Sequence, residues 1–394
     1  MRLERRTFAA LAFALGLAAC ATSPPLRGTG DLGVVVERAS GSILIVDTTE
    51  KREIDRVEGL GDLSHASVVF SRDGRYAFIF GRDGGLSKVD LLTGEIAARI
   101  IQAGNSIGGA ISQDGRIVAV ANYEPGGVRF FSTDDLSPIA EVPSTYGADG
   151  ARSKVVGIEE LADNRFIFAL YDAGAIWTVG LDDGAEPEVE RFADVGKLPY
   201  DALLTPDGRN YIAGLFGEDG LVALDLWDED PAPRRILDGY GKGEAPLPVY
   251  KMPHLEGWSV AGDRLFLPAI GRHELLVVDR ASLKEIDRIQ VHGQPVFAIA
   301  RPDGRQVWVN FAHPDNDVVQ VIDVPTDRIV KELRPGPGVL HMEFTPKGEE
   351  VWISVRDANR VDIVDTETFE TVGSIEAEAP SGIFFTARAH RLGY

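Results

Sequence analysis

The chain repeats a unit of three short β-strand segments joined by tight turns, and this repeat limits the possible folds more than any other feature. It is clearest in residues 65–94, where the segments HASVVF, YAFIF and LSKVD are separated by the turns SRDGR and GRDGG. Short apolar runs interrupted by Asp-Gly are typical of a β-meander. The turn after the first segment recurs at intervals of 41 to 54 residues, at Gly74, Gly115, Asn164, Gly208, Gly262, Gly304 and Gly348.

The third segment of the unit recurs eight times. The copies are ILIVD, LSKVD, VRFFS, IWTVG, LVALD, LLVVD, VQVID and VDIVD. A period of this size, with several strands per unit and no helical periodicity between units, predicts an all-β protein, a single eight-bladed β-propeller. The first unit lacks an obvious innermost strand before Val34, whereas SGIFFTAR at 381–388 offers a spare strand. We therefore expect the N- and C-terminal segments to share one blade, which protects an open sheet edge.

Repeats and charge indicate one acidic domain. No single blade could bury its own faces, so residues 31–394 are predicted to form one propeller. The chain has 61 acidic residues and 40 basic residues, a formal charge of −21, and no basic run follows its N-terminal leader. Such a balance disfavours nucleic acid and anionic membrane surfaces as partners.

The only cysteine, Cys20, ends a segment with export features. Residues 1–19 have a basic start, an apolar core and small residues before Cys20, so they resemble a bacterial lipoprotein signal peptide, with Cys20 lipidated. A buried core cysteine is the alternative. The tetrapeptide RRTF at 5–8 also resembles a twin-arginine export motif, which leaves the export route open. We expect residues 20–30 to form a flexible tether that anchors the protein in the periplasm.

Polar side chains are predicted to converge over the central channel. Consecutive strands of a propeller blade alternate in direction. The start of the innermost strand and the loop between the second and third strands therefore lie on the same face of the ring. Residues at these two places share one rim: His65, His254, Arg82, Lys154, Arg272, His313 and Arg356, with Tyr171 and Tyr200 among them. The alternative for each arginine is a surface turn in which it pairs with the neighbouring Asp.

This rim has a distinct chemical character in an otherwise acidic chain. Arginine forms bidentate hydrogen bonds with carboxylates, and neutral imidazole is a good ligand for iron. The pattern therefore suits a flat ligand that has several carboxylates and carries a metal.

The segment SHASVVFSRDGRYAFIFGRDGGLSKVDL resembles a blade of the d1 domain of cytochrome cd1 nitrite reductase. In that blade a histidine is the proximal ligand of haem d1, and an arginine follows in Gly-Arg-Asp-Gly. The resemblance implies that His65 is the axial iron ligand and that Arg82 binds a carboxylate. It covers the whole chain after the leader. Because no c-type haem domain precedes the first blade, the resemblance is to the NirF family of haem d1 biosynthesis.

Departures from the reductase pattern bear on function. One distal histidine of the reductase falls in KLPYDALL, where this chain has Tyr200, and the other falls near His254 in YKMPHLEGW. The chain also lacks CxxCH, the attachment motif for a c-type haem. The resemblance therefore implies a haem d1-type ligand without nitrite reduction, with Lys154, and Arg272 or Arg356, as further carboxylate ligands.

Two functions follow from the resemblance. The first is a late extracytoplasmic step of haem d1 biosynthesis, in which the protein binds and modifies haem d1 or a dihydro-haem d1-type precursor, with Tyr200 and His254 as candidate catalytic residues. The second is a carrier that delivers the tetrapyrrole to other haem d1 biosynthesis proteins or to cytochrome cd1 nitrite reductase. The residues also leave open an interaction propeller without a cofactor and a propeller enzyme acting on sugars or lactones.

Overall fold

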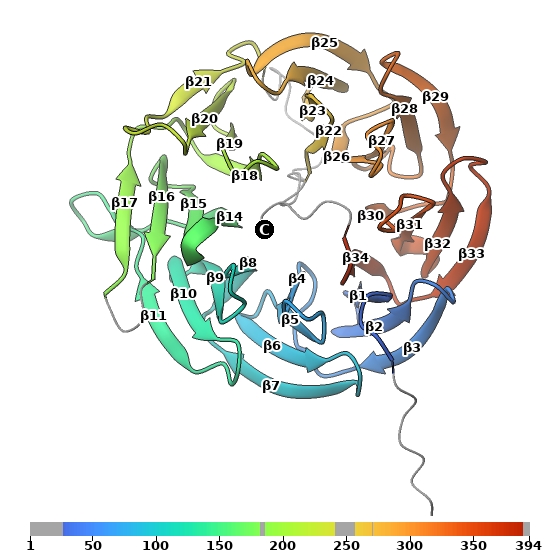
Figure 1. The fold of residues 1–394 in the computed structure, drawn as a ribbon, viewed down its shortest axis with the longest axis horizontal. Helices are drawn as coiled ribbons and strands as arrows, with labels where there is room; N and C mark the ends of the chain where they lie inside the picture. The colour runs from blue at the N-terminus through green and yellow to red at the C-terminus, as the bar shows by residue number, and fades with distance from the viewer. Residues whose placement is uncertain (1–26, 182–185, 241–256, 270, 389–394) are drawn as a thin grey trace, which may run out of the picture.

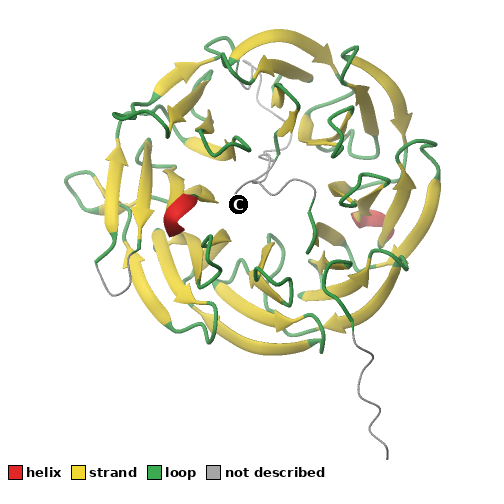
Figure 2. Ribbon diagram, in the orientation of Figure 1, coloured by secondary structure: helices red, strands yellow, loops and turns green. Residues whose placement is uncertain are grey.

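The computed structural model describes residues 27–181, 186–240, 257–269 and 271–388, which form a ring of β-sheets around a central axis (Figure 1). Eight of these sheets have four antiparallel strands each, and Figure 2 shows how little of the described chain is helical. The predicted all-β, eight-bladed propeller is confirmed. In the part of the chain that the structure describes, no helix is long and apolar enough to cross a bilayer.

The first four blades follow the chain in order. Blade one contains β1 (Leu32–Glu37), β2 (Ser42–Asp47), β3 (Arg52–Val57) and the C-terminal β34 (Pro380–Phe385). Blade two contains β4 (Ser67–Phe70), β5 (Tyr76–Phe80), β6 (Gly85–Asp90) and β7 (Glu95–Ile101). Blade three contains β8 (Asn105–Ile111), β9 (Ile117–Glu124), β10 (Gly127–Ser132) and β11 (Pro138–Val142). Blade four contains β14 (Val155–Glu160), β15 (Phe166–Leu170), β16 (Ala175–Gly180) and β17 (Glu188–Phe192).

The other four blades repeat this plan. Blade five contains β18 (Pro199–Leu204), β19 (Asn210–Leu215), β20 (Leu221–Asp225) and β21 (Arg234–Ile236). Blade six contains β22 (Ser259–Ala261), β23 (Arg264–Ala269), β24 (Glu274–Asp279) and β25 (Lys284–Gln290). Blade seven contains β26 (Pro295–Ala300), β27 (Gln306–Phe311), β28 (Val319–Asp323) and β29 (Arg328–Leu333). Blade eight contains β30 (Val339–Phe344), β31 (Glu350–Val355), β32 (Arg360–Asp365) and β33 (Thr371–Glu376).

Three small elements lie in the loops between strands. A two-stranded ribbon, β12 (Thr145–Tyr146) and β13 (Ala151–Arg152), follows blade three, and two short 3-10 turns are η1 (Ala162–Asn164) and η2 (Arg356–Ala358).

Strand β34 joins the two ends of the described chain. It pairs antiparallel with β1, with Gly33 opposite Phe385 and Val35 opposite Ile383, and it supplies the innermost strand of blade one (Figure 1). Beyond the strand, the Thr386 hydroxyl donates to the Leu32 carbonyl at 2.9 Å. The pairing gives β1 a partner on its inner edge, where backbone groups would otherwise lack one.

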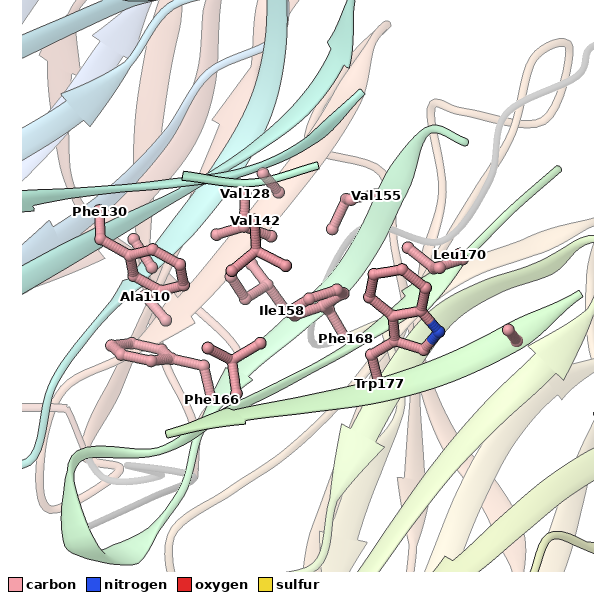
Figure 3. Close-up of a cluster of buried hydrophobic side chains, with 14 residues drawn as sticks. Ala110, Val128, Phe130, Val142, Val155, Ile158, Phe166, Phe168, Leu170 and Trp177 are labelled. Carbon is pink, nitrogen blue, oxygen red and sulfur yellow. The ribbon is translucent and has the colours of Figure 1, made fainter. Parts of the chain in front are cut away.

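The core lies between neighbouring blades, because both faces of each middle strand are covered. Strands such as β2 are therefore buried along their whole length, whereas the outermost strand β25 is almost fully exposed. Figure 3 shows the cluster between blades three and four, where the rings of Phe130 and Phe166 lie 5.4 Å apart at a tilt of 53°. Such aromatic pairs add packing energy to the burial of apolar area.

A bulge recurs in the innermost strands. The pairing register with the second strand shifts in β8, β14, β18, β26 and β30, close to the start of each strand. A bulge places an extra residue against one partner and redirects the side chains there. In β14 the shift includes Gly157, at φ +57°, where a Cβ would lie 2.8 Å from both Ala202 and the Tyr211 hydroxyl. The bulges therefore decide which side chains line the channel.

Residues before β1 are held against the ring. Arg27, within the expected tether, forms ion pairs with Asp47 at 2.8 Å and Asp31 at 3.2 Å, and the Thr29 hydroxyl donates to the Asp73 carbonyl at 2.7 Å. Residues 27–30 thus contact the propeller. The predicted signal peptide and Cys20 lie outside the described residues.

Phe130 tests how much the packing between blades contributes. Truncation to Ala leaves a cavity between two rings, so Phe130→Ala should lower the free energy of unfolding by about 3 to 5 kcal/mol. Ile139 is a matched control on the same blade, because its side chain is 49% exposed. Chemical denaturation of Ile139→Ala should show a loss below about 1 kcal/mol. Equal losses in the two variants would contradict the proposed location of the core.

Candidate functional site

A cavity of about 570 Å³ occupies the channel. Its walls come from the innermost strands β4, β8, β14, β18, β30 and β34, which are far apart in the sequence but lie around the same channel (Figure 1). The middle of the wall is apolar, with Val68, Ile107 and Val156 among its side chains, and polar groups lie toward both ends. The cavity is large enough for a sizeable part of a small-molecule ligand.

Three of the predicted site residues line this cavity at the same end. His65 immediately precedes β4, Arg82 lies between β5 and β6, and Tyr200 is the second residue of β18. His65 is half-buried, whereas the Arg82 side chain is exposed. The structure thus brings a histidine, an arginine and a tyrosine to one mouth of the channel. This common location is the geometry that the strand order predicted.

Arg38 is a cavity residue that the sequence analysis missed. It follows β1, the second strand of blade one, and so has the same position in its blade as Arg82 has in blade two. Burial lowers the pKa of Arg38, and the charges of Arg356 and Arg82 lower it further. The Arg38 guanidinium is therefore close enough to the other two guanidinium groups to be repelled by both. The run VVVER before ILIVD, together with the expected innermost strand at 381–388, was the available signal.

The cations at this mouth differ in their partners. In the described part of the chain, no carboxylate lies within ion-pair distance of the Arg38 or Arg82 guanidinium. The hydrogen bonds from Ser64 lower the pKa of the Asp62 carboxyl, and the more distant positive charges of Arg82 and Arg38 lower it further. Arg356, in contrast, forms two hydrogen bonds with the adjacent Asp357, at 2.6 and 2.9 Å. Arg38 and Arg82 thus supply positive charge that is available for an anion.

Two tyrosines form a hydrogen-bonded pair on the wall. The hydroxyl oxygens of Tyr123 and Tyr200 are 2.8 Å apart, and the Tyr171 ring packs edge-on against Tyr200 at 5.7 Å. Burial raises the pKa of Tyr200 to about 12 and raises the pKa of Tyr123 still further, while the nearby charge of Arg82 slightly opposes both shifts. Both phenols are therefore protonated at neutral pH and can serve as hydrogen-bond donors.

The opposite end of the cavity has neutralised charges. Arg72, just after β4, forms an ion pair with Glu160 at 3.0 Å and donates to the Ser112 carbonyl at 2.7 Å. Arg388, after β34, pairs with Glu343 at 3.3 Å. Because these cations have carboxylate partners, the two ends differ in electrostatic character: the mouth at His65 is cationic, and the far end is balanced.

The remaining predicted site residues do not line the cavity within the described part of the chain. Lys154 lies on the same rim but forms an ion pair with Asp172 at 3.2 Å. Arg272 is exposed, and its charge acts on Glu285 in the outermost strand β25. Arg356 is held by Asp357, as described above. His254 lies outside the described residues.

The bulges contribute polar groups that no sequence pattern indicated. Asp201 in β18 and His341 in β30 both fall at the register shifts, and both line the cavity. A regular alternation along each strand would not predict their direction, because a bulge changes which residues face the channel.

Comparisons with known proteins agree with this fold and cavity. Residues 27–389 match the family described as the cytochrome D1 heme domain, so the chain belongs to that class of protein. Protein NirF of Pseudomonas aeruginosa is 58% identical over 379 residues, which cover 96% of each chain. Protein NirF of Stutzerimonas stutzeri is 57% identical over 389 residues, which cover 98% of this chain and 99% of the relative. Within its class, this chain is therefore a member of the NirF family.

A solved structure shares the fold. Dihydro-heme d1 dehydrogenase NirN in complex with DHE superimposes with a TM-score of 0.79 at 26% identity, covering 94% of this chain and 78% of that chain.

The tyrosine pair predicts how stability depends on pH. The pKa of Tyr200 in the folded protein is about 12, above its usual value of about 10. The unfolded chain therefore loses this proton first as the pH rises, so the folded state loses stability between about pH 10 and 12. Chemical denaturation at about pH 9 and about pH 11 gives the free energy of unfolding at each pH. Its decrease between the two should be smaller for Tyr200→Phe than for the wild type. Identical losses would contradict the buried, protonated pair.

Proposed function

We propose that this protein binds haem d1 or a dihydro-haem d1-type precursor in the channel cavity and acts at a late step of haem d1 biosynthesis. Membership of the NirF family supports the pathway. The observation that carries the ligand assignment is the cavity itself, in which His65 and two arginines without carboxylate partners among the described residues meet at one mouth.

The residues at the mouth fit an iron tetrapyrrole with carboxylate substituents. His65 would hold the iron as its axial ligand, since imidazole nitrogen is a common haem ligand. Arg38 and Arg82 would bind carboxylates through charge-assisted hydrogen bonds. A bound tetrapyrrole would supply the redox-active metal and the conjugated ring. Lys154 and Arg356 would bind a ligand carboxylate only if they broke their ion pairs with Asp172 and Asp357.

The protein's own groups can orient the ligand and donate hydrogen bonds. The protonated hydroxyls of Tyr123 and Tyr200 offer one donor beyond the hydrogen bond that they share. We propose that Tyr200, with His254, acts in a modification of a peripheral substituent or in a ring redox change. The apolar wall between the two ends of the cavity would exclude water from a bound macrocycle.

A carrier function is the second candidate, and the titration properties of the cavity favour it. Burial moves the pKa of Tyr123 and Tyr200 upward and that of His341 down to about 3, so each of these three groups keeps a single protonation state around neutral pH. Such a carrier would deliver the tetrapyrrole to another haem d1 biosynthesis protein or to cytochrome cd1 nitrite reductase. Incubation with a purified precursor distinguishes the two functions, because an enzyme yields a product of new mass and a carrier does not.

The proposed location is the periplasm, with a lipid anchor at Cys20. This proposal rests on the sequence of residues 1–20, with its basic start, apolar core and Leu-Ala-Ala-Cys ending. An anchor would keep the protein close to membrane-associated partners. Membrane fractionation of wild type and Cys20→Ser would test it.

Replacement of His65 tests the axial ligand. Titration of wild-type protein with haem d1, followed by absorbance, should give saturable binding with a shifted Soret band. His65→Ala removes the imidazole, so its affinity should fall about tenfold or more and its Soret position should change. Added free imidazole should restore the wild-type band.

Two results would contradict these assignments. If His65→Ala has the wild-type affinity and Soret position, His65 is not the axial ligand. If the wild type itself fails to bind haem d1, the proposed function is wrong.

Arg38 and Arg82 should both contribute to affinity. A charge-assisted hydrogen bond contributes about 1.5 to 3 kcal/mol, so Arg38→Ala and Arg82→Ala should each weaken haem d1 binding by about 10- to 100-fold. Arg209 is a suitable control, since it is exposed, lies in a turn of blade five and pairs with Asp225 at 2.7 Å. Arg209→Ala should bind as the wild type does. Equal losses in all three variants would indicate a general effect of net charge instead of a defined site.

A further inference from the structure

His341 is a cavity residue that neither the sequence patterns nor the proposed function accounts for. It lies in a bulge of β30, where Val339 pairs with Val355 and Met342 pairs with Ile353. Two residues, Leu340 and His341, therefore stand opposite a single residue of β31, Ser354. Both bulge residues line the cavity.

The backbone of this bulge is fixed by a buried serine. The Ser354 hydroxyl oxygen accepts a hydrogen bond from the His341 N–H at 2.8 Å, and the same hydroxyl donates to the His341 carbonyl at 3.2 Å. Ser354 is fully buried. Both backbone groups freed by the bulge thus have a partner, which holds His341 toward the channel.

The imidazole ring is fixed by two aromatic rings and by a hydrogen bond to one nitrogen. It stacks on Phe384 at 5.5 Å and 30°, and it meets the Phe297 ring edge-on at 5.2 Å and 87°. The backbone N–H of Ile383, in β34, donates to Nδ1 at 3.1 Å. Three neighbouring residues therefore determine the orientation of the ring.

This hydrogen bond determines the tautomer. A nitrogen that accepts a hydrogen bond has no proton of its own, so the neutral ring carries its proton on Nε2. Burial, together with the positive charge of Arg388, lowers the pKa of His341 to about 3. The charged group that acts on the ring therefore opposes protonation. The ring is neutral, with an Nε2–H group, over the whole physiological range of pH.

The Nε2–H group is available to a ligand. Among the described residues, the hydrogen bonds of His341 are those of its backbone and of Nδ1, and none involves Nε2. The side chain lines the cavity, so an acceptor on a bound molecule is the natural partner for this donor.

We propose that His341 contacts the bound molecule and donates one hydrogen bond from Nε2–H to a carbonyl or carboxylate oxygen. This proposal rests on the proposed function of the same cavity. It assigns His341 a role distinct from that of His65, because a nitrogen that carries a proton has no lone pair for iron. His341 would recognise an oxygen atom at the edge of the ligand, whereas His65 would bind the metal.

The tautomer can be measured without any ligand. Nitrogen-15 NMR of the histidine-labelled protein should show one imidazole with a bare Nδ1 and a protonated Nε2, unchanged between about pH 5 and 8. The chain has seven histidines, and the signal missing from His341→Gln assigns this ring. A proton on Nδ1, or titration within this range, would overturn the proposal.

Binding of haem d1 tests the donor itself. His341→Phe keeps an aromatic ring between Phe384 and Phe297 but removes the N–H, so its affinity should fall about tenfold. His341→Gln keeps an amide N–H donor of similar reach and should bind more tightly than His341→Phe. Thermal melting of both variants shows whether the fold is retained.

The outcomes separate the two proposals. Wild-type binding together with equal affinity in a folded His341→Phe variant would overturn the role of His341 alone. Failure of the wild type to bind haem d1 would overturn the proposed function and this donor with it. The expected result is binding by the wild type, a tenfold loss in His341→Phe and a partial recovery in His341→Gln.

Discussion

The pairing of β34 with β1 closes the ring, and the channel exists only because of this closure. It joins segments at opposite ends of the described chain, as in the hydrogen bond from the Glu378 N–H to Glu37, which spans 341 residues. Closing so long a loop has an entropic cost, which the packing of blade one against its two neighbours must exceed. Without β34, blade one has no innermost strand and the channel has a gap in its wall.

The same strand also helps to form the candidate site. Its residues Gly382 and Phe384 line the cavity, and its Ile383 N–H fixes the tautomer of His341. By taking the inner position in blade one, it places β1 second, so that the loop after β1 brings Arg38 to the mouth where Arg82 lies. Ring closure and the chemistry of the mouth therefore have a common structural cause.

The electrostatics of the cavity distinguish one mouth from the rest of a strongly acidic chain. At the far end, arginines pair with carboxylates of other blades, including Arg72 with Glu160 and Arg388 with Glu343. Arg38 and Arg82, which line the other end of the cavity, have no ion pair with a described carboxylate. Burial lowers the pKa of Arg38, and repulsion from the charges of Arg356 and Arg82 lowers it further. A carboxylate at this mouth would relieve that repulsion, which gives binding a favourable electrostatic contribution.

The repeated turns and strands were enough to specify the eight-bladed ring, because only stacked blades can satisfy their spacing. The order of residues also specified that His65, Arg82 and Tyr200 meet, since strand direction alternates within each blade. Which cations remain available depends instead on contacts in three dimensions: Lys154 and Arg356 are held by Asp172 and Asp357. The direction of His341 likewise emerges only in the folded ring, because a bulge interrupts the alternation on which sequence patterns depend.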